Sequence, residues 1–221
     1  HAYHQDALVG HVQTSKPHDA TAWQRFLSTG PVAFLPLSDG RSSVVWSVAR
    51  DQASHLCALD SQSFSQALTE ASGEVLGRCE LTTQLASFPL KLKYAVDYAR
   101  PRAVLLGDAA HVVHPLAGQG LNLGLLDCAA LAQVLGEARG AAQFGDYKHL
   151  RRYERWRRSE NLLAAAALDG LERLFSNNDP RVAALRRAGL SAVEGMPNIK
   201  RRFAKRALGM AGDVPEFLKA I

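Results

Sequence analysis

The chain has 221 residues and a formal net charge of +5, with 47% hydrophobic and 21% charged residues. These are ordinary values for a folded globular protein, and they exclude a disordered tail and a collagen-like fibre. The three cysteines, Cys57, Cys79 and Cys128, have neither metal-ligand nor redox spacing, so a disulfide scaffold is excluded as well.

The first hundred residues are predicted to form strands with a few short helices. Apolar and β-branched runs bounded by turn signals indicate three strands: Ala7–Thr14, Val32–Leu37 and Ser43–Ala49. A short helix is expected from Asp19, a favourable N-cap residue, to Phe26. A second helix is expected from Asp60 or Ser61 to about Ala71 for the same reason.

Two further apolar stretches precede residue 107. Gln84–Tyr98 has the pattern of a long bent strand. Pro89 within it favours a sheet edge or a bulge, because proline cannot donate a hydrogen bond to a strand ladder. Ala103–Leu106 is a short apolar run, which is typical of a buried strand.

Helical patterns dominate after residue 107. Four helices are predicted: Gln119–Ala138, Gly145–Ser176, Pro180–Ala188 and Asn198–Leu208. Strands followed by helices indicate an α+β fold. We expect a mixed or antiparallel sheet with short helices, then a strand–loop–helix segment, then a helical C-terminal tail.

The segment with the clearest chemical signal joins the run 103–106 to the next helix. Gly107-Asp108 ends the predicted strand, and Pro115, Gly118 and Gly120 follow. A carboxylate at a strand end favours a polar ligand, and glycines let a ligand approach the backbone. The free N–H groups of a helix start attract negative charge. A flavin with its ribityl chain fits this pattern. Alternatively, Asp108 only caps the helix and the glycines only turn the chain.

The same segment carries a family resemblance. Gly107-Asp-Ala-Ala-His111, with Pro115 and Gly118-Gln-Gly-Leu-Asn122, resembles the second flavin motif of the class A FAD-dependent aromatic hydroxylases. Further segments are similar to the ubiquinone-biosynthesis hydroxylases of that class: Pro17-His18, Gln24–Phe26, Gly30–Leu37, Val45–Ser47, Phe88–Leu90, Tyr153–Arg155, Asn161, Leu174–Asn177 and Leu185–Leu190. The resemblance therefore covers nearly the whole chain.

The resemblance implies the para-hydroxybenzoate-hydroxylase-like fold. A substrate-binding sheet domain would span residues 1–100, the C-terminal piece of the FAD-binding domain 101–140, and a helical region 141–221. Asp108 would bind the ribityl hydroxyls of FAD, and Pro115 would lie near the isoalloxazine ring. The backbone facing the pyrimidine end of the flavin, where negative charge develops on reduction, would come from Gly118, Gln119, Gly120, Leu121 and Asn122.

The implied reaction is hydroxylation of the aromatic ring of a polyprenylphenol in ubiquinone biosynthesis. NAD(P)H or another donor reduces FAD, O₂ adds to give a C4a-hydroperoxide, and the distal oxygen attacks the electron-rich ring. No side-chain nucleophile is required. An apolar substrate site is expected from Phe34, Leu35, Leu37, Trp46, Phe88 and Leu90. Plain core packing is the alternative for each of these six residues.

One part of the family pattern is missing. No GxGxxG dinucleotide-binding loop occurs in the sequence. The family's intermediate Asp-Gly motif, which contacts the pyrophosphate, is missing as well, because Asp39-Gly40 is a turn dipeptide in the wrong place for it. We therefore expect a truncated hydroxylase, the C-terminal part of a longer enzyme, which neither holds FAD tightly nor hydroxylates by itself. The alternative is a non-catalytic prenylphenol- or lipid-binding accessory module of a quinone-biosynthesis complex.

Positive charge is concentrated toward the C-terminus. Residues 148–221 have a net charge of +8, against −3 for residues 1–147. Within them, Ile199–Leu208 is basic and amphipathic, which suits either a helix on a membrane surface or a solvated helix. The expected location is cytoplasmic, with peripheral attachment to the inner face of the membrane. Neither a nucleic-acid module nor a metal site is predicted, and His111 and His114 are expected to serve in loop hydrogen bonds.

Overall fold

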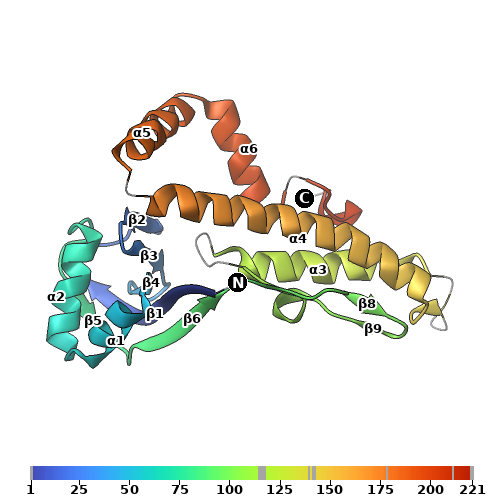
Figure 1. Cartoon of the computed structure of the whole chain (residues 1–221), viewed down its shortest axis with the longest axis horizontal. Helices are drawn as coiled ribbons and strands as arrows, with labels where there is room; N and C mark the ends of the chain where they lie inside the picture. Colours follow the sequence, from blue (N-terminus) through green and yellow to red (C-terminus); the bar gives the residue numbers. More distant parts are fainter. Residues whose placement is uncertain are drawn as a thin grey trace. The chain divides into compact units, whose positions relative to one another are not determined.

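The computed structural model describes residues 2–113, 118–138, 140, 143–177, 179–210 and 212–219. Two compact units make up the chain. The sheet unit comprises residues 2–90 and 175–177, and the helical unit comprises residues 91–174 and the described residues from 179 onward. Most elements of both units are labelled in Figure 1. The helical unit thus contains both the segment around Asp108 and most of the basic tail, while the division into three parts stays a prediction.

The sheet unit is built on a sheet that has six strands within the described ranges. They are β1 (Ala2–Thr14), β2 (Trp23–Leu27), β3 (Gly30–Pro36), β4 (Ser42–Ala49), β5 (Cys79–Leu81) and β6 (Ala86–Lys91). The strand order is β2-β3-β4-β1-β5, and β6 also pairs with β1. The antiparallel register places Leu8 opposite Trp46 and Phe34 opposite Val44. The three predicted strands are confirmed as β1, β3 and β4.

Two helices, α1 (Arg50–Ala58) and α2 (Ser61–Ser72), pack against one face of this sheet. The predicted second helix is confirmed as α2. It begins where it does because the Asp60 carboxylate accepts a hydrogen bond from the Ser63 N–H at 2.8 Å. Sequence reasoning missed α1, which follows β4 directly and has no side-chain cap.

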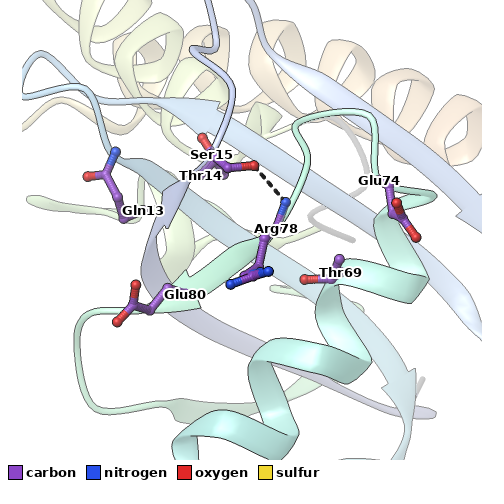
Figure 2. Close-up of a pocket in the computed structure, with 7 residues that line it drawn as sticks. All are labelled: Gln13, Thr14, Ser15, Thr69, Glu74, Arg78 and Glu80. Atoms are coloured by element: carbon purple, nitrogen blue, oxygen red, sulfur yellow. Dashed lines mark hydrogen bonds between the residues drawn. The ribbon is translucent and has the colours of Figure 1, made fainter.

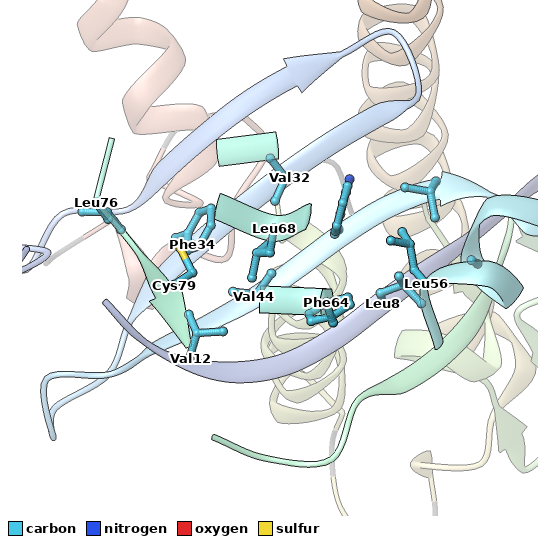
Figure 3. Packing of buried hydrophobic residues seen from close by; sticks show 13 residues of the cluster. Leu8, Val12, Val32, Phe34, Val44, Leu56, Phe64, Leu68, Leu76 and Cys79 are labelled. Atoms are coloured by element: carbon cyan, nitrogen blue, oxygen red, sulfur yellow. The ribbon is translucent and has the colours of Figure 1, made fainter. Parts of the chain in front are cut away.

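The apolar core of the sheet unit lies between α1, α2 and the covered face of the sheet (Figure 3). Alternate residues of β3 and β4 enter it, among them Phe34 and Trp46. The Trp46 ring lies 6.2 Å from the ring of Phe64 on α2, centroid to centroid. Because strand side chains alternate, Leu35 points to the opposite face of the sheet. The alternation of residues along β3 and β4 therefore places every second side chain on the buried face of the sheet.

The predicted helix from Asp19 to Phe26 is wrong. Asp19 and Ala20 have φ angles of 50° and 52°, in the left-handed region, so a right-handed helix cannot start there. The chain instead turns and forms β2, in which Trp23 pairs opposite Phe34. Aromatic residues favour a strand in this position, and that preference outweighs the capping signal.

The long bent strand predicted for Gln84–Tyr98 is divided in the structure. Part of it is β6, which contains the exposed Pro89, and the rest includes the two-residue strand β7 (Lys93–Tyr94). The predicted buried strand Ala103–Leu106 is confirmed only in part. Its first half is β9 (Ala103–Val104), which pairs with β8 (Ala99–Arg100), but the run is not buried, since Ala103 and Leu105 are exposed. A two-stranded ribbon cannot bury both faces of so short a run.

The helical unit continues with a 3₁₀ turn, η1 (Gly107–Ala109), and with β10 (His111–Val112), which pairs with β7. Its helices are α3 (Gln119–Gly136), α4 (Tyr147–Ser176), α5 (Pro180–Glu194), α6 (Pro197–Ala207) and the short η4 (Glu216–Leu218). The four predicted helices are confirmed, although α5 runs to Glu194 rather than Ala188. Helices α3 and α4 lie side by side (Figure 1) and share a core that includes Ala130, Val134 and Tyr153.

Candidate functional site

The bend after β9 presents Asp108 to solvent. Gly107 has a φ of +56°, which a residue with a side chain rarely adopts, and η1 packs against α3. A Cβ on Gly124 of α3 would lie 3.3 Å from the Gly107 Cα, so glycines on both sides permit this close approach. The Asp108 side chain is exposed. It is therefore not an internal packing residue, and its carboxylate is accessible to a polar ligand.

The start of α3 is equally open. Gly118 is the N-cap residue, with a φ of +62° and without a side-chain hydrogen bond to the helix. A Cβ at Gly118 or Gly120 would meet no atom within 4 Å, and the Leu121 side chain is 73% exposed. The first N–H groups of a helix have no partner within that helix, and they carry partial positive charge. An electron-rich group of a ligand can therefore approach the backbone N–H groups of this turn.

Those predicted flavin-binding residues that the structure describes are accessible to a ligand, at least in part. Asp108 and Asn122 are exposed, and Gln119 and Gly120 are half-buried. An acceptor for ribityl hydroxyls and an open helix start for the electron-rich end of the ring both occur in the helical unit. The donor and acceptor chemistry therefore fits this part of FAD. Pro115 and His114 lie outside the described residues.

A cluster of buried polar side chains, centred on Asp127 of α3, contacts the bend formed by residues 107–111. Its Oδ2 accepts hydrogen bonds from the Gly107 N–H at 2.9 Å and from His111 Nε2 at 2.7 Å. Its Oδ1 accepts hydrogen bonds from Arg157 Nε at 2.8 Å and from Asn161 Nδ2 at 3.1 Å. All four side chains are almost completely buried. We call Asp127, His111, Arg157 and Asn161 the Asp127 cluster.

The charges in the Asp127 cluster are matched. Burial raises the pKa of the Asp127 carboxyl, but the hydrogen bonds from His111, Arg157 and the Gly107 amide outweigh burial and hold that pKa below its usual value. An ionised Asp127 requires that His111 Nε2 carries the proton. The His111 Nδ1 atom is buried and has no hydrogen-bond partner among the described residues. Asp127 therefore holds the imidazole in one tautomer.

Helix α4 holds the segment before the bend by two further hydrogen bonds. The Tyr153 hydroxyl donates to the Leu105 carbonyl oxygen at 3.0 Å, and the Tyr98 N–H donates to Glu154 Oε1 at 3.0 Å. Burial raises the pKa of Tyr153, so its hydroxyl stays protonated and able to donate. The backbone on the N-terminal side of Asp108 is thus fixed to α4.

Sequence reasoning missed Asp127 and Arg157 and noted Asn161 only for its resemblance. One signal was available: Asp127 is the only acidic residue of the predicted helix Gln119–Ala138 other than Glu137 near its end. Arg157 and Asn161 are four residues apart, which places them on one side of α4. His111 makes a hydrogen bond, as expected, although its partner is on a helix rather than in the loop.

The six residues predicted to line the substrate site are not on one face. Phe34 and Trp46 are buried in the core under α1 and α2, so core packing describes them. Leu35 and Phe88 are 42% and 56% exposed. Leu37 is half-buried and Leu90 is buried. Alternation along β3 is the reason that neighbouring residues such as Phe34 and Leu35 separate.

A separate pocket of about 620 Å³ lies in the sheet unit (Figure 2). Polar and charged side chains line it: Gln13, Thr14, Ser15, Thr69, Glu74, Arg78 and Glu80. The Arg78 N–H donates to the Ser15 hydroxyl at 2.9 Å, which joins two of its walls. None of the residues predicted for cofactor or substrate lines this pocket, and its polarity does not suit a prenyl chain.

The remaining sequence features have structural explanations within the described residues. All three cysteines are free, and Cys79 is buried in the core of the sheet unit. Trp156 of α4 donates its Nε1–H to the Asp213 carbonyl oxygen at 2.9 Å. Over the part of the chain that the structure describes, no helix has the length and apolarity needed to span a membrane.

Comparisons with known proteins identify the family. A family model described as an FAD binding domain matches residues 5–164. The chain is 41% identical over 215 residues to the ubiquinone hydroxylase UbiL of Rhodospirillum rubrum, covering 97% of this chain and 50% of that protein. It is 37% identical over 211 residues to the 3-demethoxyubiquinol 3-hydroxylase of Escherichia coli, covering 94% of this chain and 53% of that protein.

A solved structure shares the fold. The p-nitrophenol 4-monooxygenase PnpA of Pseudomonas putida superposes with a TM-score of 0.70 at 18% identity, covering 94% of this chain and 54% of that one. The chain spans about half the length of the curated relatives it matches. The family model covers most of the chain. The chain therefore belongs to the FAD binding domain family of flavin-dependent monooxygenases.

Proposed function

We propose that the protein to which this chain contributes hydroxylates the aromatic ring of a polyprenylphenol in ubiquinone biosynthesis. The observation that carries the proposal is the exposed Asp108 at a glycine bend, in the same unit as the open start of α3. Similarity to ubiquinone-pathway hydroxylases over more than nine-tenths of the chain supports the substrate class. The comparisons do not favour a non-catalytic accessory module.

In this proposal Asp108 accepts hydrogen bonds from the ribityl hydroxyls of FAD. The backbone N–H groups at the start of α3 stabilise negative charge on the pyrimidine end of the flavin. Bound FAD supplies electron transfer from a donor such as NAD(P)H and activation of O₂. The chain's own task is to hold the cofactor, orient the phenol and exclude water.

Exposed apolar side chains of the sheet unit are suited to the substrate's prenyl tail. Leu35 and Phe88 remain exposed although both lie in strands. We assign tail contact to these two residues, and not to the buried Phe34 and Trp46. Substituting Leu35 with Trp in the hydroxylating enzyme should reduce kcat/KM for a long-tailed phenol more than for a short-tailed one. Equal losses for both substrates would contradict this assignment.

The flavin assignment can be tested with the chain and with a fusion. We expect the purified chain to be colourless, because it has no GxGxxG loop to bind the pyrophosphate. A fusion that places the N-terminal half of the Escherichia coli relative before this chain should bind one FAD. Asp108→Ala in the fusion should weaken FAD binding at least tenfold, measured by quenching of FAD fluorescence. Unchanged affinity after Asp108→Ala would contradict the flavin assignment. Stoichiometric flavin on the chain alone would contradict the expectation that FAD binding needs the GxGxxG loop.

The α5–α6 surface supports a second part of the proposal, contact with an anionic membrane. Residues 180–208 contain eight Lys or Arg residues and one acidic residue, Glu194. Leu185 of α5 and Phe203 of α6 are 73% and 64% exposed, and Ile199 lies one helical turn before Phe203. Basic side chains around exposed apolar ones suit the interface of an anionic bilayer. Such contact would bring the enzyme to a substrate with a lipid tail.

Vesicle flotation tests the membrane contact. The chain should float with phosphatidylglycerol-containing vesicles and remain unbound with pure phosphatidylcholine. Phe203→Ser should reduce the floated fraction severalfold, because it removes the largest exposed apolar side chain of α6. Leu105→Ser is the matched control, since Leu105 is an exposed apolar residue elsewhere in the same unit. Equal flotation of wild type and Phe203→Ser would contradict the assignment.

A further inference from the structure

Burying the charged groups of the Asp127 cluster costs more free energy than burying apolar side chains of similar volume would. A carboxylate with no exposed surface loses its hydration, and a buried ion pair is often no more stable than apolar residues of similar volume. Arg157, itself 1% exposed, compensates the charge of Asp127 from α4. Stability alone does not explain why this position on α3 carries an acid.

The geometry supplies a reason. Among the described residues, one carboxylate oxygen, Oδ2, accepts its hydrogen bonds from the bend, through the Gly107 N–H and His111 Nε2. The other oxygen, Oδ1, accepts those from α4, through Arg157 and Asn161. The two Oδ2 partners lie on either side of Asp108 in sequence. Asp127 therefore anchors both ends of the short turn that carries Asp108, and α4 in turn anchors Asp127.

We propose that Asp127 is a positioning residue for the flavin motif: it fixes the Gly107 amide and the His111 ring so that the Asp108 carboxylate is held outward in one orientation. The inference rests on the proposed role of Asp108 in FAD binding. Asp127 itself is buried and does not touch the cofactor. Holding a ligand-binding group in one geometry before binding reduces the entropy lost on binding.

The decisive variant is Asp127→Asn, which keeps the shape and removes an acceptor. In the full chain, amide hydrogen exchange at Gly107 should become at least tenfold faster. Nitrogen NMR of the His111 ring should show the Nε2–H tautomer in the wild type and loss of that single-tautomer signature in the variant. In the FAD-binding fusion described above, the variant should weaken FAD binding at least tenfold. A residue with only a general stabilising role would leave the tautomer unchanged.

Two sets of controls complete the experiment. Asp60→Asn removes a carboxylate that also accepts a backbone N–H, but in the sheet unit, and should change neither Gly107 exchange nor FAD affinity by more than twofold. His111→Gln keeps an N–H donor for Asp127, whereas His111→Phe removes it. We expect His111→Gln to retain FAD affinity within threefold and His111→Phe to lose at least tenfold. If Asp127→Asn does not fold, this pair decides the question through Gly107 amide exchange and FAD affinity.

The outcomes separate the two proposals. Unchanged Gly107 exchange and an unchanged His111 tautomer in Asp127→Asn would overturn the positioning role, even if FAD binding fell. Equal FAD affinity of His111→Gln and His111→Phe would overturn it as well. A third outcome would refute the flavin role of Asp108, and with it the function on which this inference rests. In that outcome Gly107 exchange becomes faster in Asp127→Asn, but Asp127→Asn and Asp108→Ala both bind FAD with normal affinity.

Discussion

The sheet unit and the helical unit bury different kinds of residue. The core of the sheet unit is apolar, with Phe34, Trp46, Phe64 and Leu68 between strands and helices. The helical unit has apolar clusters too, but beside them it buries Asp127, His111, Arg157 and Asn161. Apolar packing is non-directional and tolerates small shifts, whereas hydrogen bonds fix donors and acceptors at set distances. The Asp127 cluster is hydrogen-bonded to the bend that carries Asp108, the residue proposed to bind the flavin.

The largest effect is expected where a buried charge loses its partner. Asp127→Ala leaves the Arg157 guanidinium buried without compensation, and should reduce the free energy of unfolding by about 3–5 kcal/mol. Amide hydrogen exchange, read by mass spectrometry on peptides from each unit, measures this loss of stability. Exchange should rise in residues 91–174 while the core of the sheet unit keeps its protection. A uniform rise over both units would show that they are not energetically separate.

A smaller loss is expected from a cavity in the apolar core. Leu68 of α2 is fully buried, and Leu68→Ala should reduce the free energy of unfolding by about 3 kcal/mol. The increase in amide hydrogen exchange should be confined to the sheet unit. Leu185→Ala is the control, because this leucine is 73% exposed and should change stability by less than about 0.5 kcal/mol. A loss as large at Leu185 would mean that α5 is covered in solution.

Acid should weaken the helical unit through Asp127. The folded pKa of this carboxyl is lowered, so its contribution to stability is present above the ordinary aspartate value and is lost as pH falls through the folded pKa. We therefore expect the midpoint of thermal unfolding of the helical unit to fall as pH decreases below about 4. Asp127→Asn should show a shallower decrease over the same pH range. Parallel curves for the two proteins would assign the acid response to other groups.

The smallest effect concerns a helix end. Gly73 follows α2 with a φ of +68°, so Gly73→Ala forces a side chain into the left-handed region and should cost about 1–2 kcal/mol. Gly170 lies inside α4, where a Cβ would meet no atom within 4 Å. Gly170→Ala should stabilise the chain by about 0.5–1 kcal/mol, since it reduces the freedom of the unfolded state. Chemical denaturation of both variants checks the opposite signs.

Much of this protein could be inferred from local patterns. Alternation of apolar residues indicated β1, β3 and β4, and helical spacing indicated α3 to α6. The flavin site in the run from Gly107 to Asn122 stays a prediction. These signals are local because strand and helix periodicity and turn chemistry depend on neighbours in sequence. The same local reasoning failed at Asp19, where a capping residue type lies in a turn before a strand.

Tertiary structure alone decided which residues support the site. Asp127 is separated from His111 by sixteen positions and from Arg157 by thirty, and only the packing of α3 against α4 and the bend brings them within hydrogen-bond distance. It also decided that Phe34 enters a core while Leu35 stays exposed, because α1 and α2 cover the face of the sheet to which Phe34 points. Sequence determines what each segment can form, and the burial of one surface against another selects which polar groups must then find partners.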